Sequence, residues 1–333
     1  MSGGLISRVA DHCFWMGRYV ERAESTSRLL QTTRGLVLDT ELTPEECWRP
    51  LLVAAGEDRP FIKRFGEAAT SDAETVEQYM TWDESNLSSL FNTVCAAREN
   101  TRSIREVVSL DAWESLNELY LWLTSTAARQ EFTAHRYGFH RTVCDSIQLC
   151  LGLLRSTMLH DTPLDFIWMG VMLELAGQTA RLLDMHQAPG RMAERHPVVE
   201  MSVWLALLRA VSSLEPFLQR HRGKVTSHAA ATFLILDPSL PRSLRYCLRA
   251  ADEKLRRVLP RGAESSTQLA TLTAWVESLD PATIDPRVLH VPLTRAVDGI
   301  AAVCEAIDKE LFVERPGAKP EAVVQETATS MAG

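Results

Sequence analysis

Residues 15–30 read WMGRYVERAESTSRLL, a stretch in which charged side chains stand inside an otherwise apolar helical pattern. A second copy, WMGVMLELAGQTARLL, follows at residues 168–183, at a constant offset of 168 − 15 = 153 residues. Tryptophan, methionine, glycine, glutamate, alanine, threonine, arginine and two leucines recur in register. The two copies predict two related helical halves with an approximate two-fold relation, because a solenoid would need more copies at a shorter period.

Composition limits the class of protein. The chain has 333 residues, of which 46% are hydrophobic and 23% charged, as in soluble globular proteins. Its net charge of −8 argues against a general nucleic-acid or anionic-membrane binder, which needs a positive surface. There is neither an apolar signal core nor a membrane-spanning run, and the seven scattered cysteines form no C-x-x-C pair. We therefore expect a cytoplasmic protein with reduced thiols.

Apolar residues recur at steps of three or four along most of the chain, which predicts helices and no strands. The predicted helices span residues 5–38, 43–56, 86–108, 112–134, 138–159, 161–189, 198–218, 227–236, 242–259, 265–279 and 294–312. Residues 56–72 are predicted to be a loop or a short helix. The expected fold is an all-α multi-helix bundle over residues 1–312, divisible into halves 1–159 and 160–312. Residues 313–333 are small, polar and proline-containing, and are expected to form a disordered tail.

The first copy of the repeat carries a candidate anion site. On a helix, Arg18 lies one turn from both Glu21 and Arg22, and guanidinium groups match the geometry of carboxylate and phosphate. Glu21 would orient these groups or act as a catalytic base. The second copy has Val171 and Leu175 in place of the two arginines, so the site is expected to be asymmetric and built from the first copy.

A structural role is the alternative for the charges that both copies share. Glu21 and Arg28 stand seven residues apart, as do Glu174 and Arg181, and two helical turns separate such residues by about 10 Å. If the two helices pack antiparallel, Glu21 would meet Arg181 and Glu174 would meet Arg28. These buried ion pairs would set the register of the two helices.

Two further basic clusters are candidates for anion binding. Arg98 and Arg102 share a helix face, which either is solvated and internally paired or joins the first-copy arginines in one basic pocket. Arg242 and Arg245 stand at a helix start, where free N–H groups also favour an anion. The sequence has no nucleotide-binding or zinc motif, and no metal ligands are predicted.

Several motifs together resemble the bacterial alpha-E domain family, which is named for its helices and an E-R motif. The matching segments are LISRVA at 5–10, WMGRYVERAE at 15–24 with its E-R at Glu21 and Arg22, ARENTR at 97–102, WESLN at 113–117 and LDPSLPRSLRYCL at 236–248. Genes for family members typically lie beside, or are fused to, genes for circularly permuted ATP-grasp proteins and transglutaminase-like proteins. In the second copy, Glu174 is followed by Leu175 where relatives often keep another E-R.

The resemblance implies a partner subunit of an amide-bond-forming or peptide-modifying system. We expect this chain to bind an ATP-grasp ligase and an anionic peptide or acyl-phosphate intermediate through its arginines. ATP and Mg would belong to the partner, and this chain would hold no cofactor of its own. Two alternatives stay open: an independent enzyme acting on peptide or amide bonds with Glu21 as general base, and a purely structural scaffold.

Overall fold

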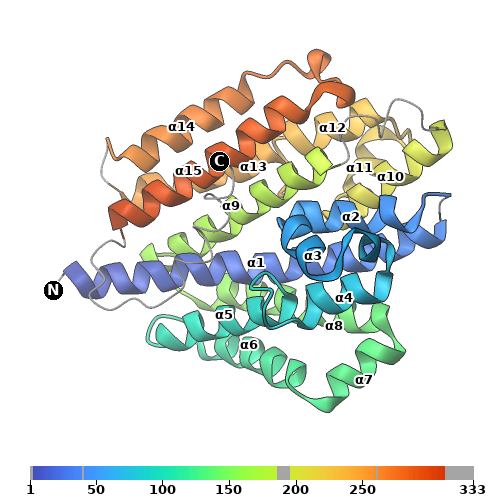
Figure 1. Ribbon diagram of the computed structural model, residues 1–333. Coiled ribbons are helices and arrows are strands. Elements are labelled where there is room, and N and C mark those ends of the chain that lie inside the picture. Colours follow the sequence, from blue (N-terminus) through green and yellow to red (C-terminus); the bar gives the residue numbers. More distant parts are fainter. Residues whose placement is uncertain (1–2, 40, 186–195, 260–261, 312–333) are drawn as a thin grey trace.

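Helix α1 (Gly3–Asp39) runs through the middle of the molecule, and the other helices are arranged around it (Figure 1). The computed structural model describes residues 3–39, 41–185, 196–259 and 262–311, and these ranges contain fifteen α-helices and no strand. The predicted all-α fold class is confirmed. The other helices are α2 (Pro44–Ala55), α3 (Asp58–Phe65), α4 (Ala73–Trp82), α5 (Leu90–Ser103), α6 (Leu110–Leu123), α7 (Thr126–Ala134), α8 (Arg136–Thr157), α9 (Thr162–Met185), α10 (Pro197–Ala210), α11 (Leu214–His221), α12 (Ser227–Leu236), α13 (Leu244–Val258), α14 (Glu264–Glu277) and α15 (His290–Leu311).

The helices form layers on either side of α1. Helix α9 packs directly on α1, and α13 and α15 pack on α9, with α14 against both of them (Figure 1). On the other side, α5 and α8 pack on α1, and α6 packs on α8. One continuous hydrophobic core runs through both predicted halves of the chain. The two copies of the repeated motif therefore lie side by side on α1 and α9, at the centre of this core.

Two glycines bring α1 and α9 into close backbone contact. A Cβ atom on Gly17 would lie 2.1 Å from the carbonyl oxygen of Ile167, and one on Gly170 would lie 2.2 Å from that of Phe14. The contact is reciprocal, because 170 − 17 and 167 − 14 both equal 153. Only glycine permits so close an approach. This reciprocity concerns the crossing alone, and the two-fold relation of the whole halves stays a prediction.

The two helices run in the same direction, so the antiparallel packing assumed from the sequence is wrong (Figure 1). Equivalent residues of the two copies face each other at the same level along the pair. Parallel packing therefore brings Glu21 and Glu174 into the same region of the core. The charged residues around them have to compensate two neighbouring carboxylates.

Several predicted helix bounds are also wrong, because polar side chains end or start a helix within an apolar pattern. The helix predicted over 86–108 is limited to α5, since the Ser89 hydroxyl accepts a hydrogen bond from the Asn92 N–H at 3.3 Å as its N-cap. Ser125 caps α7 in the same way and divides the predicted helix 112–134. The predicted helix 198–218 is divided into α10 and α11, and α4 was not predicted at all.

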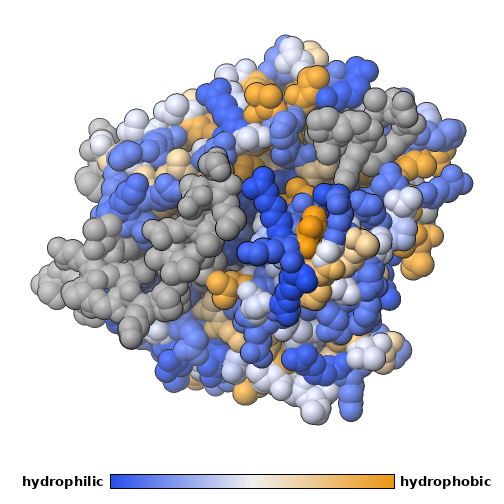
Figure 2. Space-filling model, in the orientation of Figure 1, coloured by the Kyte–Doolittle hydropathy of each residue, from blue (hydrophilic) through white to orange (hydrophobic). Residues whose placement is uncertain are grey.

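Other sequence-based expectations concern surface and termini. No helix among the described residues has the length and apolarity needed to cross a membrane. The seven cysteines are all unpaired thiols, as predicted. Figure 2 shows a largely hydrophilic face on which hydrophobic side chains form small, separate patches. The predicted tail at 313–333 and the predicted helix end near Pro189 lie outside the described residues.

Candidate functional site

Three glutamates lie buried where α1 and α9 meet the turn before α13. Glu21 and Glu174 are each 1% exposed and Glu24 is fully buried. A buried carboxylate requires compensating charge and hydrogen bonds, because burial strongly disfavours its ionised form. Five arginines supply this charge: Arg18, Arg22, Arg28, Arg181 and Arg242. We call these eight residues the central network.

Glu174 is the more completely compensated of the two sequence-equivalent glutamates. Arg22 binds it in a bidentate manner, with Nε 2.9 Å from Oε1 and Nη2 3.1 Å from Oε2. Arg18 donates from Nε to Oε2 at 2.9 Å, and the Gln178 side-chain amide donates to Oε1 at 3.1 Å. Burial alone would raise the pKa of Glu174, but Arg22 and Arg18 outweigh it and hold the pKa well below its usual range. Glu174 is therefore ionised at neutral pH.

Aromatic rings hold the two first-copy arginines in place. The guanidinium of Arg18 lies 5.1 Å from the ring centroid of Trp15, and that of Arg22 lies 5.6 Å from the ring of Tyr19. Such cation–π contacts orient a guanidinium while leaving its N–H groups available. The two arginines are thus fixed toward Glu174. The anion site predicted at Arg18 and Arg22 is therefore already filled by the carboxylate of Glu174.

Glu21 and Glu24 share one arginine from a distant part of the chain. Arg242, just before α13, places Nη1 3.2 Å from Glu21 and Nη2 2.6 Å from Glu24. The Thr179 hydroxyl on α9 donates to the backbone carbonyl of Arg242 at 3.0 Å and helps to fix this turn. Glu24 is bound by Arg28 as well, on its own helix. The central network therefore ties α1 to both α9 and the start of α13.

The two cross-helix ion pairs predicted from the sequence, Glu21 with Arg181 and Glu174 with Arg28, are wrong. In the parallel arrangement Glu174 lies at the level of Glu21 on α1, beside Arg18 three residues before this level and Arg22 one residue after it. Arg28 instead binds Glu24, four residues earlier on the same helix. By the same symmetry, Glu21 would face Val171 and Leu175, which carry no charge. This explains why Glu21 depends on an arginine from outside the repeat.

The expectation that residues seven apart cannot meet on one helix is also wrong. Nη2 of Arg181 lies 3.8 Å from Oε1 of Glu174. Gly177 permits this, because a Cβ there would lie 3.3 Å from Nη1 of Arg181, and its absence lets the guanidinium fold back along the helix. The contact is long for an ion pair, so Arg181 is the least firmly bound arginine of the network.

The central network carries an excess of positive charge. It contains five arginines and three carboxylates, and Arg181 shows the effect most directly. Burial lowers its pKa, Glu174 opposes this, and the neighbouring Arg22 and Arg18 lower it further. Arg181 is also the most exposed of the five, with 30% of its side chain accessible. An anion beside Arg181 would therefore relieve electrostatic repulsion that the protein leaves uncompensated.

Glu21 has the electrostatics of a base but little access. Burial raises its pKa to about 8. Arg242 and the Ser25 hydrogen bond lower this pKa, and the nearby carboxylate of Glu24 raises it. The Ser25 hydroxyl donates to its Oε1 at 2.9 Å. A general base must reach the proton that it removes, and a side chain this deeply buried and already bonded does not meet that requirement.

The remaining predicted anion-binding residues lie outside the central network. Arg98 bonds Asn117 and Glu99 and lies over the ring of Tyr120, and Arg102 pairs with Glu99 at 2.7 Å. Arg102 therefore lies on a solvated, internally paired face, Arg98 packs against α6, and neither residue joins the central network. Arg245 is directed to Glu277 on α14, at 3.5 Å, and the Ser243 hydroxyl caps the start of α13 by accepting from the Tyr246 N–H at 3.1 Å.

Sequence reasoning missed Glu24, although its signal was present. Glu24 and Arg28 have the four-residue spacing at which opposite charges pair on a helix. Gln148 of α8 completes the surroundings of Glu24 by donating to Oε1 at 3.1 Å, and no local pattern indicates that contact. No cluster of potential metal ligands occurs among the described residues.

The fold and the site define a class: an all-helical protein whose two central helices are joined by a buried arginine–glutamate network. Residues 5–312 match the Alpha-E family, described as a predicted alpha-helical domain with a conserved ER motif, and the chain belongs to this family. The E-R dipeptide on which the resemblance was based, Glu21 and Arg22, has side chains that bind Arg242 and Glu174 respectively. The motif therefore joins α1 to two other parts of the fold.

Similar curated proteins are much longer than this chain. Uncharacterised proteins of Mycobacterium bovis and of Mycobacterium tuberculosis are each 26% identical to it over 275 residues. The match covers 78% of this chain but only 30% of each relative. No solved structure was found to match the chain.

Proposed function

We propose that this chain is a cytoplasmic helical partner subunit of an ATP-grasp amide or peptide ligase. In this proposal it binds the ligase and holds an anionic peptide or acyl-phosphate intermediate beside Arg181. ATP and Mg belong to the partner, and a transglutaminase-like protein is a further candidate partner. The observation that carries the proposal is the uncompensated positive charge at Arg181.

The central network suits the binding of a reactive anion. Arg18 and Arg22 stay bound to Glu174, and Arg181 lies 3.8 Å from the same carboxylate, so an anion can approach Arg181 without displacing the other two arginines. Arg181 offers the accessible guanidinium, which matches a carboxylate or phosphate group. An acyl phosphate hydrolyses readily in water, and a largely buried cluster of arginines would both neutralise and shield it.

The length of the relatives supports a role alongside other protein parts. In the two mycobacterial proteins the matched region is 30% of a longer chain. The region that is part of a longer protein in these relatives would here assemble with a separate partner chain. The chain resembles a family whose genes typically lie beside genes for ATP-grasp proteins. This resemblance gives the proposed chemical class of the partner.

Arg181→Gln is expected to reduce product formation by the complex about tenfold or more, since it removes one charge-assisted contact to the anion. The variant keeps its fold and still co-purifies with the ligase, because Glu174 retains Arg18 and Arg22. The measurement is amide ligation by the neighbouring ATP-grasp protein, with wild-type or variant chain added and with none. Arg102→Gln is the matched control and leaves the rate unchanged, since Arg102 is 60% exposed and pairs with Glu99.

The two alternatives give different results in the same assay. An independent enzyme would form or cleave amides without the ligase, and the pKa of about 8 at Glu21 is the observation that favours it. A purely structural scaffold would leave ligation equally fast with Arg181→Gln and with the wild-type chain. Ligation that proceeds at the same rate without this chain would overturn the partnership itself.

A further inference from the structure

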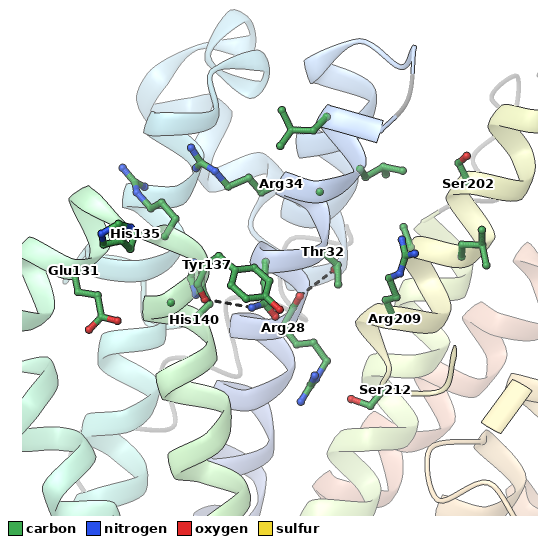
Figure 3. A pocket seen from close by; sticks show the side chains of 18 of the residues that line it. Arg28, Thr32, Arg34, Glu131, His135, Tyr137, His140, Ser202, Arg209 and Ser212 are labelled. Atoms are coloured by element: carbon green, nitrogen blue, oxygen red, sulfur yellow. Dashed lines mark hydrogen bonds between the residues drawn. The ribbon is translucent and has the colours of Figure 1, made fainter. Parts of the chain in front are cut away.

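A large cleft lies beside the central network. It has a volume of about 1360 Å³ and lies between the C-terminal half of α1, the junction of α7 and α8, and helix α10 with the turn after it (Figure 3). Drug-sized ligands commonly occupy about 300–1,000 Å³, so this cleft has room for an extended organic molecule. Arg28 belongs to both the network and the cleft, but the anion site at Arg181 is separate, because Arg181 does not line the cleft.

Two arginines make one end of the cleft cationic. Arg28 on α1 uses Nε and Nη2 to bind Glu24, and its Nη1 has no recorded bond within the described chain. Arg209 on α10 is exposed and makes no ion pair or side-chain hydrogen bond to the described residues. Figure 3 shows these two side chains on the two sides of the gap between α1 and α10.

The opposite end of the cleft is already neutralised. Arg34 and Arg136 line it, but both bind the buried carboxylate of Glu77, at 2.7 and 2.6 Å. Figure 3 places Glu131 at this end, far from Arg209. Among the arginines that line the cleft, Arg209 is the one without an ion pair to the described residues, and Arg28 keeps one free N–H group beside its pair with Glu24. The carboxylate of Glu215, three residues after Ser212, also lines the cleft.

An unsatisfied hydroxyl stands at this same cationic end. Ser212 lines the cleft, and its Oγ is buried with no hydrogen-bond partner in the described structure. Its backbone has φ of 51°, in the left-handed region that favours glycine. This left-handed residue ends α10, since the Ser213 N–H donates to the Leu208 carbonyl at 2.7 Å in the pattern of a helix C-cap. A buried polar group without a partner is unusual. The unpaired hydroxyl is explained if Ser212 donates to a ligand.

We propose that this cleft binds an organic anion, with a carboxylate or phosphate group held between Arg28, Arg209 and Ser212. The rest of the ligand extends along the apolar side chains of Leu205 and Ala206, which line the same wall. The two arginines supply charge and the hydroxyl supplies a directed hydrogen bond, a combination that suits either kind of oxyanion. This site goes beyond the proposed partnership and does not depend on it.

The test is isothermal titration calorimetry of the full chain with three probes: triglutamate, tripolyphosphate and neutral triglutamine. At least one anionic probe is expected to bind, and triglutamine is expected not to. Arg209→Gln weakens that binding about tenfold or more, the effect of one lost charge-assisted contact. Arg155→Gln, at an exposed arginine of α8 that does not line the cleft, leaves it unchanged. The probe that binds identifies the ligand as a carboxylate or a phosphate.

A second variant keeps the test decisive if Arg209→Gln folds poorly. Ser212→Gly relieves the left-handed backbone, so it is expected to raise the melting temperature while weakening anion binding. The proposal is overturned if neither anionic probe binds, if triglutamine binds equally well, or if Ser212→Gly leaves the affinity unchanged. It is also overturned if Arg209→Gln and Arg155→Gln weaken binding to the same extent.

Discussion

Glutamine in place of Glu174 is expected to lower the free energy of unfolding by about 3–5 kcal/mol at neutral pH, whereas Glu21→Gln raises it by about 1 kcal/mol. The first variant leaves Arg18, Arg22 and Arg181 without their shared counter-charge in a buried site. The second removes a carboxylate that is costly to ionise. Urea denaturation followed by circular dichroism measures both.

The opposite signs follow from the asymmetry of the repeat. Glu174 receives two arginines across the parallel helix pair, but the equivalent positions opposite Glu21 are Val171 and Leu175. Arg242 partly replaces them, and it is shared with Glu24. Equal losses of stability for the two variants would show that the sites are compensated alike and would contradict this account.

The pH dependence of the two variants gives a second check. The pKa of Glu174 is lowered on folding, so its contribution is present above the ordinary carboxyl pKa and disappears as the pH falls further. The loss caused by Glu174→Gln therefore shrinks in acid. The pKa of Glu21 is raised from 4.5 to about 8, so the wild-type chain loses stability as the pH rises through that window. Glu21→Gln abolishes this decline, and its advantage over the wild-type chain grows between pH 5 and pH 8.

Local patterns in the sequence predicted most helices well and failed at specific positions. Helix α1 was predicted over 5–38 and spans Gly3–Asp39, and the helix predicted over 43–56 is α2, which spans Pro44–Ala55 with Thr43 as its N-cap. Hydrophobic periodicity continues through Ser89 and Ser125, yet their hydroxyls cap new helices there. The spacing of apolar residues indicates which face of a helix is buried. It does not indicate where a side chain accepts a hydrogen bond from a backbone N–H group and so starts a new helix.

The sequence predicted most of the residues that form the central network, but it did not predict which of them bind each other. The repeat correctly singled out residues 18, 21, 22, 28, 174 and 181, because charges inside an apolar helical pattern must be buried together. The pairing failed because it depends on the direction in which α9 runs along α1, and both directions fit the same sequence. Arg242 came from an independent cluster, 221 residues from Glu21, and only the tertiary fold brings the two together.

Gly170→Ala is expected to lower the free energy of unfolding by about 3 kcal/mol or more, at the upper end of the costs of overpacking. The added methyl group would lie 2.2 Å from the carbonyl oxygen of Phe14, and backbone atoms of a buried helix cannot rotate away as a side chain can. The two helices must separate, which lengthens the contacts of Arg18 and Arg22 with Glu174. The decrease in the free energy of unfolding is therefore expected to exceed the cost of packing one extra methyl group.

Gly152→Ala is the matched control for this substitution. Gly152 lies within α8, and a Cβ there would meet nothing within 4 Å. Alanine in a helix interior is favoured over glycine, so this variant gains about 0.5–1 kcal/mol. Gly17→Ala, with its Cβ 2.1 Å from the Ile167 carbonyl oxygen, repeats the loss seen with Gly170→Ala. If both crossing glycines tolerate alanine as Gly152 does, α1 and α9 are not in backbone contact, and the central network cannot have the short arginine–glutamate distances that depend on that contact.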